Sequence, residues 1–550
     1  MICLAEVSGA RTVERAYVVT DKDVYVTGDR IWCSAFCLDV TRGQLSTVSS
    51  VLYLELHDGT KMLQGAKIAL LDGRGCGYMN IPSNLPTGNY RLVAYTSQNR
   101  SETAYDYNGI AARTISIFNP FSRERGLAVA VSPEEYKSAP APYVDDAPVK
   151  VEVPRQAAPS SSVQIGLASA GAASVCVSVF REEGIAHNAN PTIADFISSA
   201  ATLGGRHFKQ DVIPDYEGEI VRAQIVGADP SRRGEWVGKT AIISAPGNRS
   251  DIYMSMIDED GSVAFYTNNI YGDKDLVCEL VAADSTLKGH LELFSPFTAT
   301  GVEASLPLQL CSTVASSLAE MAAAVQIERN FSADTLYEYM PLRNNLLFDD
   351  SGSILYRLDD YRRFPTFAEV FTEYLFEIRA REGGRRLQVG RRGSHGNKVL
   401  FRNRESLFLL DGVPVTDQSL IYNYDPQLVE TIRIFPESFK IGPEYYDGIV
   451  DFTTYKHNLP SMKFGDRVRV LKFRGVSYPA AYTGASLPDA SLWPDFRRTV
   501  YWHPMIELPA GEAATIDVRL PGAAGDYTVV VEGITSDGQP IYTRSAFSVR

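Results

Sequence analysis

The sequence predicts a mainly β protein made of tandem β-sandwiches, with one small α+β domain in its C-terminal half. The chain has 550 residues, which is enough for several domains. Short runs of alternating apolar and polar residues recur along it and are separated by turns containing Gly or Pro, as in sandwiches. The 29 Tyr and 24 Phe also suit a β-rich chain, because aromatic residues favour strands.

The overall charge and the cysteines exclude several classes of protein. The formal net charge is −13, which disfavours nucleic acid as a partner. The seven cysteines are odd in number and lack paired spacing, so we expect neither a disulfide framework nor a zinc site, and no cofactor is implied. Cys33 and Cys37 fall in one predicted strand, too far apart to bridge each other.

Targeting signals are sparse. No apolar run reaches the roughly 18 residues of a membrane span, so we expect no transmembrane helix. The apolar start at Met1 is interrupted by Glu6, so no full signal peptide is visible in this sequence.

Residues 11–118 are predicted to form the first sandwich. Strands are expected at Ala16–Thr20, Ile31–Leu38 and Val51–Leu56, and the turn that begins at Leu85-Pro86 leads into another strand ending at Thr96. In Val51–Leu56 the apolar and polar side chains alternate between the two faces.

The first sandwich resembles the second macroglobulin-like domain of the alpha-2-macroglobulin family. The resemblance rests on the segment Asp21–Trp32, with its Gly28-Asp29 pair, and on the segment Leu85–Thr96. It implies a fibronectin-like fold. That family's reactive thioester needs a Gln after its cysteine motif, and the sequence following Cys76 lacks one. We therefore expect Cys76 to be a buried strand residue.

Residues 119–148 are predicted to be a linker, because they contain the Pro- and Ala-rich stretch Ser138–Pro142. Residues 149–213 are predicted to be a degraded sandwich, with a helical excursion at Thr192–Gly204. Ala173–Phe180 has the composition of a buried strand.

Residues 214–299 are predicted to form a further sandwich, which resembles carboxypeptidase-regulatory-like and immunoglobulin-like modules. Asp251–Met256 and Ser262–Tyr266 are predicted to pair as a hairpin around the turn Asp258–Gly261. Residues 300–358 form a mixed connector that includes the Ala-rich, helix-forming segment 316–327.

The α+β domain is predicted at residues 359–456. The apolar run Leu407–Leu410 stops at Asp411-Gly412, a pair that tolerates positive φ in a tight turn. Alternation predicts a strand around Ile432 and Ile434, and another at Ile449–Thr453.

A helix is expected near the start of the α+β domain. Thr366 and Glu369 form a capping-box pair, and apolar residues from Val370 to Ile378 follow helical spacing. The core of the domain should contain Ile432, Ile434, Ile449 and Phe452, with the basic side chains outside.

The α+β domain resembles the plug domain of TonB-dependent outer-membrane receptors. Too few residues follow it to build the barrel in which a plug sits, so transport is not implied. Together with the macroglobulin-like modules, it resembles envelope proteins of the Bacteroidetes type. The motif residues, with either a structural or a partner-contact role, are Asp411, Gly412, Pro414, Asp425, Pro426 and Gly448.

A basic run lies within the α+β domain. Residues 379–404 contain nine Lys or Arg and one acidic residue. The run is interpreted either as a solvated surface or as a partner contact, and its centre comprises Arg385, Arg386, Arg391 and Arg392.

The C-terminal residues 465–550 are predicted to form a last macroglobulin-like or immunoglobulin-like sandwich. Val468–Phe473 should be its first strand. The segment Gly525–Gly533 resembles the Gly88–Tyr90 turn and strand of the first sandwich.

Catalytic motifs are missing. The sequence has no zinc-binding HExxH, no Gly-x-Ser-x-Gly elbow and no phosphate loop, and a glycosidase-like pair of carboxylates is the one enzymatic option left open.

The predicted function is therefore that of a non-enzymatic cell-envelope protein, in the periplasm or at the outer membrane, that contacts other proteins. The first alternative is a macroglobulin-type protease inhibitor without a thioester, whose partner would be a protease. The second is an accessory subunit of a TonB-dependent uptake receptor, whose partner would be an outer-membrane barrel.

Overall fold

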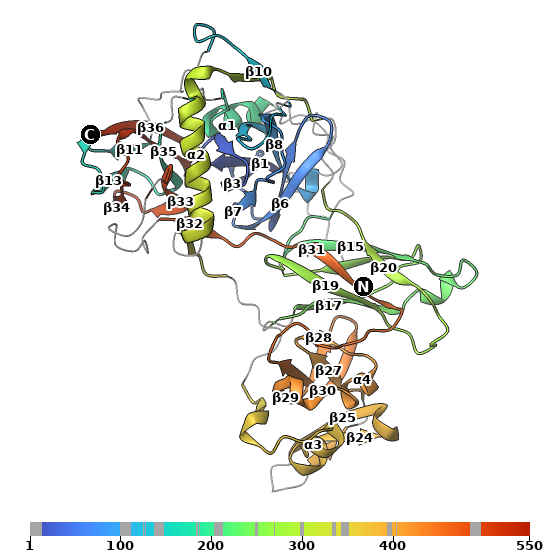
Figure 1. The fold of residues 1–550 in the computed structure, drawn as a ribbon. Helices are drawn as coiled ribbons and strands as arrows, with labels where there is room; N and C mark the ends of the chain where they lie inside the picture. Colours follow the sequence, from blue (N-terminus) through green and yellow to red (C-terminus); the bar gives the residue numbers. More distant parts are fainter. Residues whose placement is uncertain are drawn as a thin grey trace. The chain divides into compact units, whose positions relative to one another are not determined.

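The computed structural model describes residues 14–550, except 100–111, 125, 127, 137–147, 183–184, 186–187, 203–212, 248–250, 269, 298–301, 333–336, 343–350, 393–398, 403, 484–494 and 496. The protein is mainly β, with tandem sandwiches and few helices, as predicted (Figure 1). It divides into two compact units. Unit 1 comprises Met1–Gly218, Phe297–Leu342 and Val476–Arg550, and unit 2 comprises Glu219–Pro296 and Arg343–Gly475.

The first sandwich of unit 1 is one continuously hydrogen-bonded sheet folded into two layers. Its strands pair antiparallel, except that β2 and β9 are parallel. In sheet order the strands are β1 (Glu14–Thr20), β3 (Arg30–Asp39), β7 (Arg74–Asn80), β6 (Met62–Leu71), β5 (Val51–His57), β8 (Gly88–Thr96), β9 (Ala112–Phe118) and β2 (Val24–Val26), with β4 (Gln44–Leu45) beside β3.

Both faces of β5 are buried. Leu52 and Leu54 point into the core between the layers. Tyr53 packs on the opposite face with Tyr95, Val302 and the partly buried Phe297, so apolar side chains cover the face that alternation assigned to polar residues. Cys76 lies buried in β7, as predicted.

The second sandwich of unit 1 joins two distant stretches of chain. Val163 in one sheet pairs with Val518, and Val177 in the other pairs with Val531. The strands are β11 (Val149–Glu152), β13 (Ser162–Ser169) and β34 (Ala513–Arg519) in one sheet, and β12 (Gln156–Ala157), β36 (Pro540–Val549), β35 (Gly525–Thr535), β14 (Ala173–Arg181), β33 (Thr499–Leu508), β32 (Ala480–Tyr482) and β22 (Tyr337–Tyr339) in the other.

This pairing corrects the prediction of two separate domains at 149–213 and 465–550. Each stretch supplies strands to both sheets, so both are needed to complete the one core. The first strand predicted for the C-terminal domain, β31 (Val468–Arg474), belongs to unit 2, where it pairs with β19 (Asp273–Leu280).

The helices of unit 1 fall where the sequence predicts them. They are α1 (Ile193–Thr202) and α2 (Ala315–Ile327). Met321 of α2 packs against Val24 and Val26 of β2.

The predicted linker is partly structured, because β10 (Ala128–Ala130) pairs with β21 (Leu308–Leu310). Its segment Ser138–Pro142 lies outside the described residues. The predicted connector 300–358 is divided between the two units.

Unit 2 contains a sandwich whose core includes Trp236, Ile243 and Phe265. One sheet has β18 (Ser262–Tyr266), β15 (Ile220–Val226) and β20 (His290–Leu293), and the other has β17 (Asp251–Met256), β16 (Thr240–Ala245), β19 and β31. The predicted hairpin around Asp258–Gly261 is therefore wrong. The turn connects strands of opposite sheets, because each of them pairs with a different central strand.

The rest of unit 2 is a small α+β subunit, as predicted. Its main sheet has β23 (Ile354–Arg357), β29 (Val429–Ile441), β30 (Glu444–Thr454), β27 (Leu407–Leu410) and β28 (Val413–Pro414), with β27 parallel to β30. A second sheet has β24 (Ile378–Arg381), β25 (Arg386–Arg392) and β26 (Val399–Phe401), and the helices are α3 (Phe367–Glu373) and α4 (Gln418–Tyr422).

Both faces of the main sheet are covered within unit 2. Ile432, Ile434 and Phe452 pack against the helices, and Ile449 packs against Ile252 of the sandwich. All four predicted core residues of the α+β domain have an exposed fraction of 0%.

Helix α3 is shorter than its apolar spacing predicts. It ends at Glu373, and Ile378 already belongs to β24. Leu375 and Ile378 stay buried, because a turn keeps them on the side that faces the sheet. Helical spacing alone cannot distinguish this turn from a further helical turn.

Candidate functional site

The predicted plug-like motif is held together by a buried carboxylate. Asp411 and Gly412 have φ of 48° and 78°, and they make the two-residue turn between β27 and β28. The Asp411 carboxylate accepts hydrogen bonds from Thr454 N at 2.7 Å, Thr454 Oγ1 at 2.8 Å and Leu459 N at 2.8 Å. It therefore ties the turn to the end of β30.

The other motif residues also support the sheet. Pro414 is buried in β28, and Asp425 caps the 3₁₀ turn η8 (Pro426–Leu428) by accepting from Gln427 N at 2.9 Å. Gly448 has φ +87°, and a Cβ placed on it would lie 2.5 Å from Val389 Cβ, so glycine is needed where β25 crosses β30. These contacts explain the motif by folding alone.

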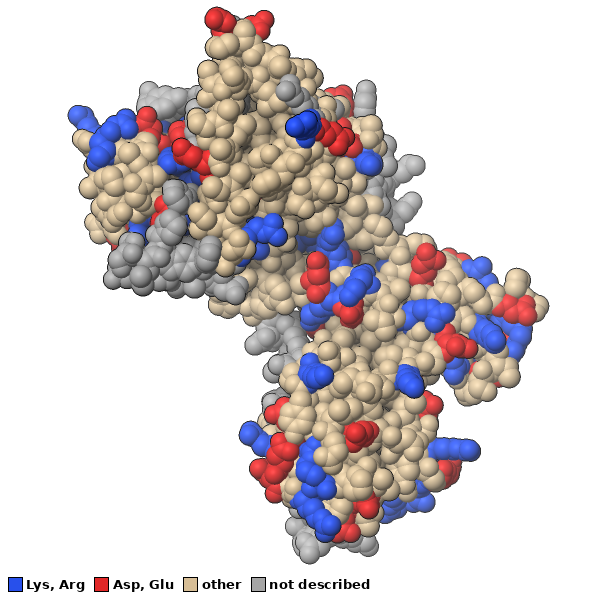
Figure 2. Space-filling model, in the orientation of Figure 1, with Lys and Arg blue, Asp and Glu red and all other residues tan. Residues whose placement is uncertain are grey.

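The basic run lies on the second sheet of the α+β subunit. Arg385 and Arg391 are exposed and Arg386 is half-buried, whereas the side chain of Arg392 lies outside the described residues. Arg391 pairs with Glu437 at 3.2 Å, with both side chains more than half exposed. Figure 2 shows basic and acidic side chains intermixed over this end of unit 2.

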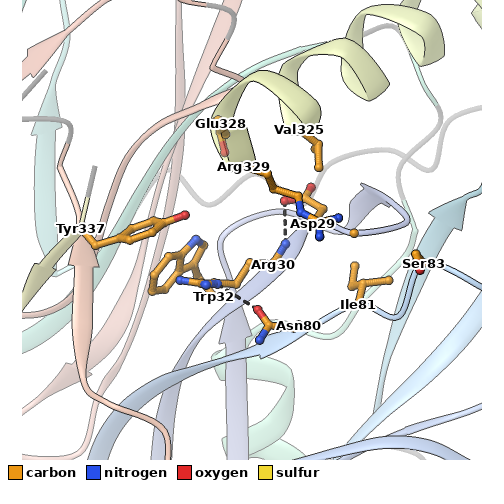
Figure 3. Close-up of a pocket in the computed structure, with 11 residues that line it drawn as sticks. Asp29, Arg30, Trp32, Asn80, Ile81, Ser83, Val325, Glu328, Arg329 and Tyr337 are labelled. Atoms are coloured by element: carbon orange, nitrogen blue, oxygen red, sulfur yellow. Dashed lines mark hydrogen bonds between the residues drawn. The ribbon is translucent and has the colours of Figure 1, made fainter. Parts of the chain in front are cut away.

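A second candidate site, missed by the sequence analysis, is a pocket of about 380 Å³ inside unit 1. It lies between the β2–β3 turn, the end of β7, the end of α2 with the π-helical turn η5 (Glu328–Ser332), and β22 (Figure 3). Its lining residues are Gly28, Asp29, Arg30, Trp32, Asn80, Ile81, Ser83, Val325, Glu328, Arg329 and Tyr337.

Arg30 is held in place among aromatic rings. Its guanidinium carbon lies 4.1 Å from the ring centroid of Tyr78, 4.8 Å from that of Tyr337 and 5.2 Å from that of Trp32. Arg30 Nε donates to Asn80 Oδ1 at 3.1 Å. Within the described residues, the buried Nη1 of Arg30 has no hydrogen-bond partner. These rings fix the guanidinium by cation–π attraction and leave part of its hydrogen-bonding capacity unused.

The neighbouring carboxylate, Asp29, is partly compensated by a lysine. Asp29 Oδ1 accepts from the backbone N of Arg30 at 2.7 Å, and Asp29 Oδ2 lies 3.4 Å from Lys22 Nζ. Nearby Asp21 pairs with the same ammonium group at 2.8 Å, which keeps Lys22 charged and the pKa of its amine raised. Asp29 therefore shares one ammonium group with Asp21 and keeps part of its negative charge, which also acts on Glu328.

Glu328 and Arg329, at the end of the helix, line the side of the pocket that lies opposite Asn80 (Figure 3). Burial and, to a smaller extent, nearby Asp29 together raise the pKa of Glu328 to about 7. Glu328 Oε1 accepts from Tyr482 Oη at 3.0 Å. Arg329 is exposed and, within the described chain, has no hydrogen-bond or ion-pair partner. A Cβ at Gly28, where φ is +86°, would lie 3.0 Å from Arg329 Nη1.

The chemistry of the pocket suits binding. It contains fixed charges, aromatic walls and a polar edge at Asn80 and Ser83, and its lining includes neither His nor Cys. Across the residues that the structure describes, no three His, Cys, Asp or Glu side chains gather as metal ligands.

The pocket residues from the first sandwich lie in a sequence pattern that could be recognised, whereas those from the end of α2 do not. Asp29 and Trp32 belong to the pattern on which the macroglobulin resemblance rests. Glu328 and Arg329 are about 300 positions further on, in a stretch predicted to be a connector, and local periodicity cannot pair such segments.

Comparisons with known proteins give structural similarity only. No family model matches the chain, and no curated protein matches it. Trypsin-activated alpha-2-macroglobulin from Escherichia coli is 9% identical at a TM-score of 0.23, over 98% of this chain and 41% of that one. A mutant Salmonella alpha-2-macroglobulin is 9% identical at a TM-score of 0.23, over 99% of this chain and 40% of that one.

A third similar structure is the E. coli adhesin FdeC, which is 9% identical at a TM-score of 0.15, over 50% of this chain and 62% of that one. The chain thus spans less than half of the two macroglobulins, and at these TM-scores no residue role can be transferred. The class that the fold itself defines is a mainly β protein of tandem sandwiches with one α+β subunit. Among its described helices the longest, α2, has 13 residues, short of the roughly 20 that cross a bilayer.

Proposed function

We propose that this chain is a non-enzymatic, macroglobulin-like protein of the bacterial cell envelope, which contacts other proteins at the outer membrane through a plug-like subunit that needs no barrel. The observation that carries the proposal is the basic run on the second sheet of that subunit, in which Arg385 and Arg391 are exposed. Residues 379–404 contain nine basic residues and one acidic residue, in a chain whose net charge is −13.

The subunit meets the first requirement of a free-standing binding module. Both faces of its main sheet are packed inside unit 2, one by α3 and α4 and the other by the sandwich strands β16 and β17. A plug inside a receptor is covered by the barrel wall. Here the sandwich takes that place, which leaves the second sheet free to present its arginines.

The basic run favours an acidic protein partner. Acidic side chains such as Glu437 lie among the arginines, but the run itself has an excess of basic residues. An excess of one charge sign speeds the encounter with a surface of opposite sign and selects against surfaces of the same sign. Exposed pairs such as Arg391–Glu437 contribute little to stability, so they are available for rearrangement on binding.

The test is cross-linking in cells that express the full-length gene. A variant with Arg385→Glu and Arg391→Glu should lose the cross-linked products of the native chain. A control with Arg155→Glu and Arg222→Glu, both exposed and outside the run, should keep the cross-linked products.

Membrane fractionation should place the protein in the envelope. Purely cytosolic protein, or identical products from the charge-reversed variant, would refute the proposal. Trapping of an added protease in a cleaved complex would replace it with the inhibitor function.

A further inference from the structure

We propose that the pocket of unit 1 binds a peptide that carries a carboxylate, with Arg30 and Arg329 as its anchors. The inference rests on the proposed function in one respect, the choice of a peptide as the source of the carboxylate. The site itself is built from one unit and is independent of the basic run on unit 2.

The first step is charge. Two guanidinium groups, Arg30 and Arg329, line the pocket. Of the two carboxyl groups, Asp29 shares the Lys22 ammonium group with Asp21 and keeps part of its negative charge, whereas Glu328 is largely neutral below neutral pH, so two guanidinium groups face one carboxylate. The balance is positive, and it favours an anion.

The second step is preorganisation. Three aromatic rings and the bond to Asn80 hold the Arg30 side chain, so little conformational entropy remains to be lost on binding. A planar guanidinium presents two parallel N–H groups to a carboxylate, and such charge-assisted pairs are among the stronger hydrogen bonds in proteins. The exposed end of Arg329 is the donor available for this, and the fixed charge of Arg30 attracts the carboxylate from the pocket wall.

The third step is size and shape. A volume of about 380 Å³ lies near the lower end of small-molecule pockets, and it suits the end of a peptide or one acidic side chain with its neighbours. Trp32, Tyr337 and Ile81 supply apolar surface, while Asn80 and Ser83 at the edge can bond to peptide groups.

Binding should depend on pH through Glu328. The charged and titratable groups facing it are Lys22, Asp29, Tyr337, Tyr482 and Arg497. The pKa values of Lys22, Tyr482 and Arg497 are raised, so these three groups keep their protons at neutral pH. Glu328 changes charge near pH 7, and its anion repels an entering carboxylate. Affinity should therefore be greatest below about pH 6 and should fall as the pH rises towards about 8.

The experiment is calorimetric titration of the full chain with acetyl-trialanine bearing a free carboxylate, and with the same peptide as its amide. The free acid should bind and the amide should bind at least about tenfold more weakly, because a charge-assisted bond is lost. Arg329→Gln should weaken the acid about tenfold or more, whereas Arg155→Gln, an exposed arginine outside the pocket, should leave the affinity unchanged. Glu328→Gln should flatten the dependence on pH.

Three outcomes would overturn the inference. They are equal binding of acid and amide, an Arg329→Gln protein that binds as the native chain does, and binding of glucuronate without binding of the peptide, which would make the ligand an acidic sugar. Because titration measures the pocket directly, its result is separate from the cross-linking result that tests the proposed function.

Discussion

Asp411 serves two purposes, one through its backbone and one through its side chain. Its backbone, at φ 48°, forms the first position of a tight turn. Its side chain, 1% exposed, accepts from the backbone N and hydroxyl of Thr454 at the end of β30 and from the backbone N of Leu459. Buried backbone donors need such partners, because an unsatisfied one destabilises the fold by roughly 1–3 kcal/mol. The turn and the sheet are therefore stabilised by the same side chain.

Gly412→Val should destabilise unit 2 by about 1–2 kcal/mol, because a β-branched residue is strained at φ 78°. Chemical denaturation followed by circular dichroism, which reports both units, should show one transition at lower denaturant and the other unchanged. Gly465→Val is the matched control, since Gly465 lies in the same unit, has open space around it and lacks a positive φ. Unchanged unfolding of the Gly412 variant would contradict the structural role of the turn.

At the scale of elements, α3 is stabilised by its cap and by its packing. Thr366 accepts from Glu369 N, and Phe367, Val370 and Phe371 are buried against the main sheet. The helix has only 7 residues, too few to be stable in isolation, so its tertiary contacts carry most of its stability.

Thr366→Ala should lower the stability of unit 2 by about 1 kcal/mol, the usual loss for an N-cap residue. On the same helix, Thr372→Ala should have little effect, because Thr372 Oγ1 only donates to the Ala368 carbonyl at 2.7 Å. Denaturant unfolding of both variants separates the two effects. Equal losses would show that the cap contributes nothing specific.

At the scale of the whole molecule, the two units are interleaved along the chain but have separate cores. Unit 2 is formed by two stretches, which interrupt unit 1 twice. Closing a long loop in the unfolded chain costs only slightly more than closing a shorter one, so such an arrangement is tolerated.

Separate cores predict two unfolding transitions. Trp236 is the single Trp in the stretches 219–296 and 343–475 of unit 2, and it lies in the sandwich core. In a Trp236→Phe protein, tryptophan fluorescence therefore reports unit 1 alone, whereas circular dichroism reports both units. Adding Gly412→Val should move a transition in circular dichroism and leave the fluorescence transition in place. A shift of both signals together would show that the units unfold as one.

Short-range chemistry was sufficient to predict the elements that depend on near neighbours. The Thr366–Glu369 cap, the Asp411-Gly412 turn and the Ala-rich helix α2 each depend on residues within a few positions of one another. Alternation likewise placed Ile432 and Ile434 in the core. These features were predictable because propensity, capping and turn geometry act locally.

The sequence by itself therefore determined the class of fold, many of its local elements and the buried residues of the α+β subunit. The tertiary structure alone decided that β13 pairs with β34 and β19 with β31, and that Arg30 and Arg329 line one pocket. The physical reason is that strand pairing and pocket assembly depend on the fit of whole surfaces, brought together from about 200 to 350 positions apart, which a local pattern of apolar residues does not encode.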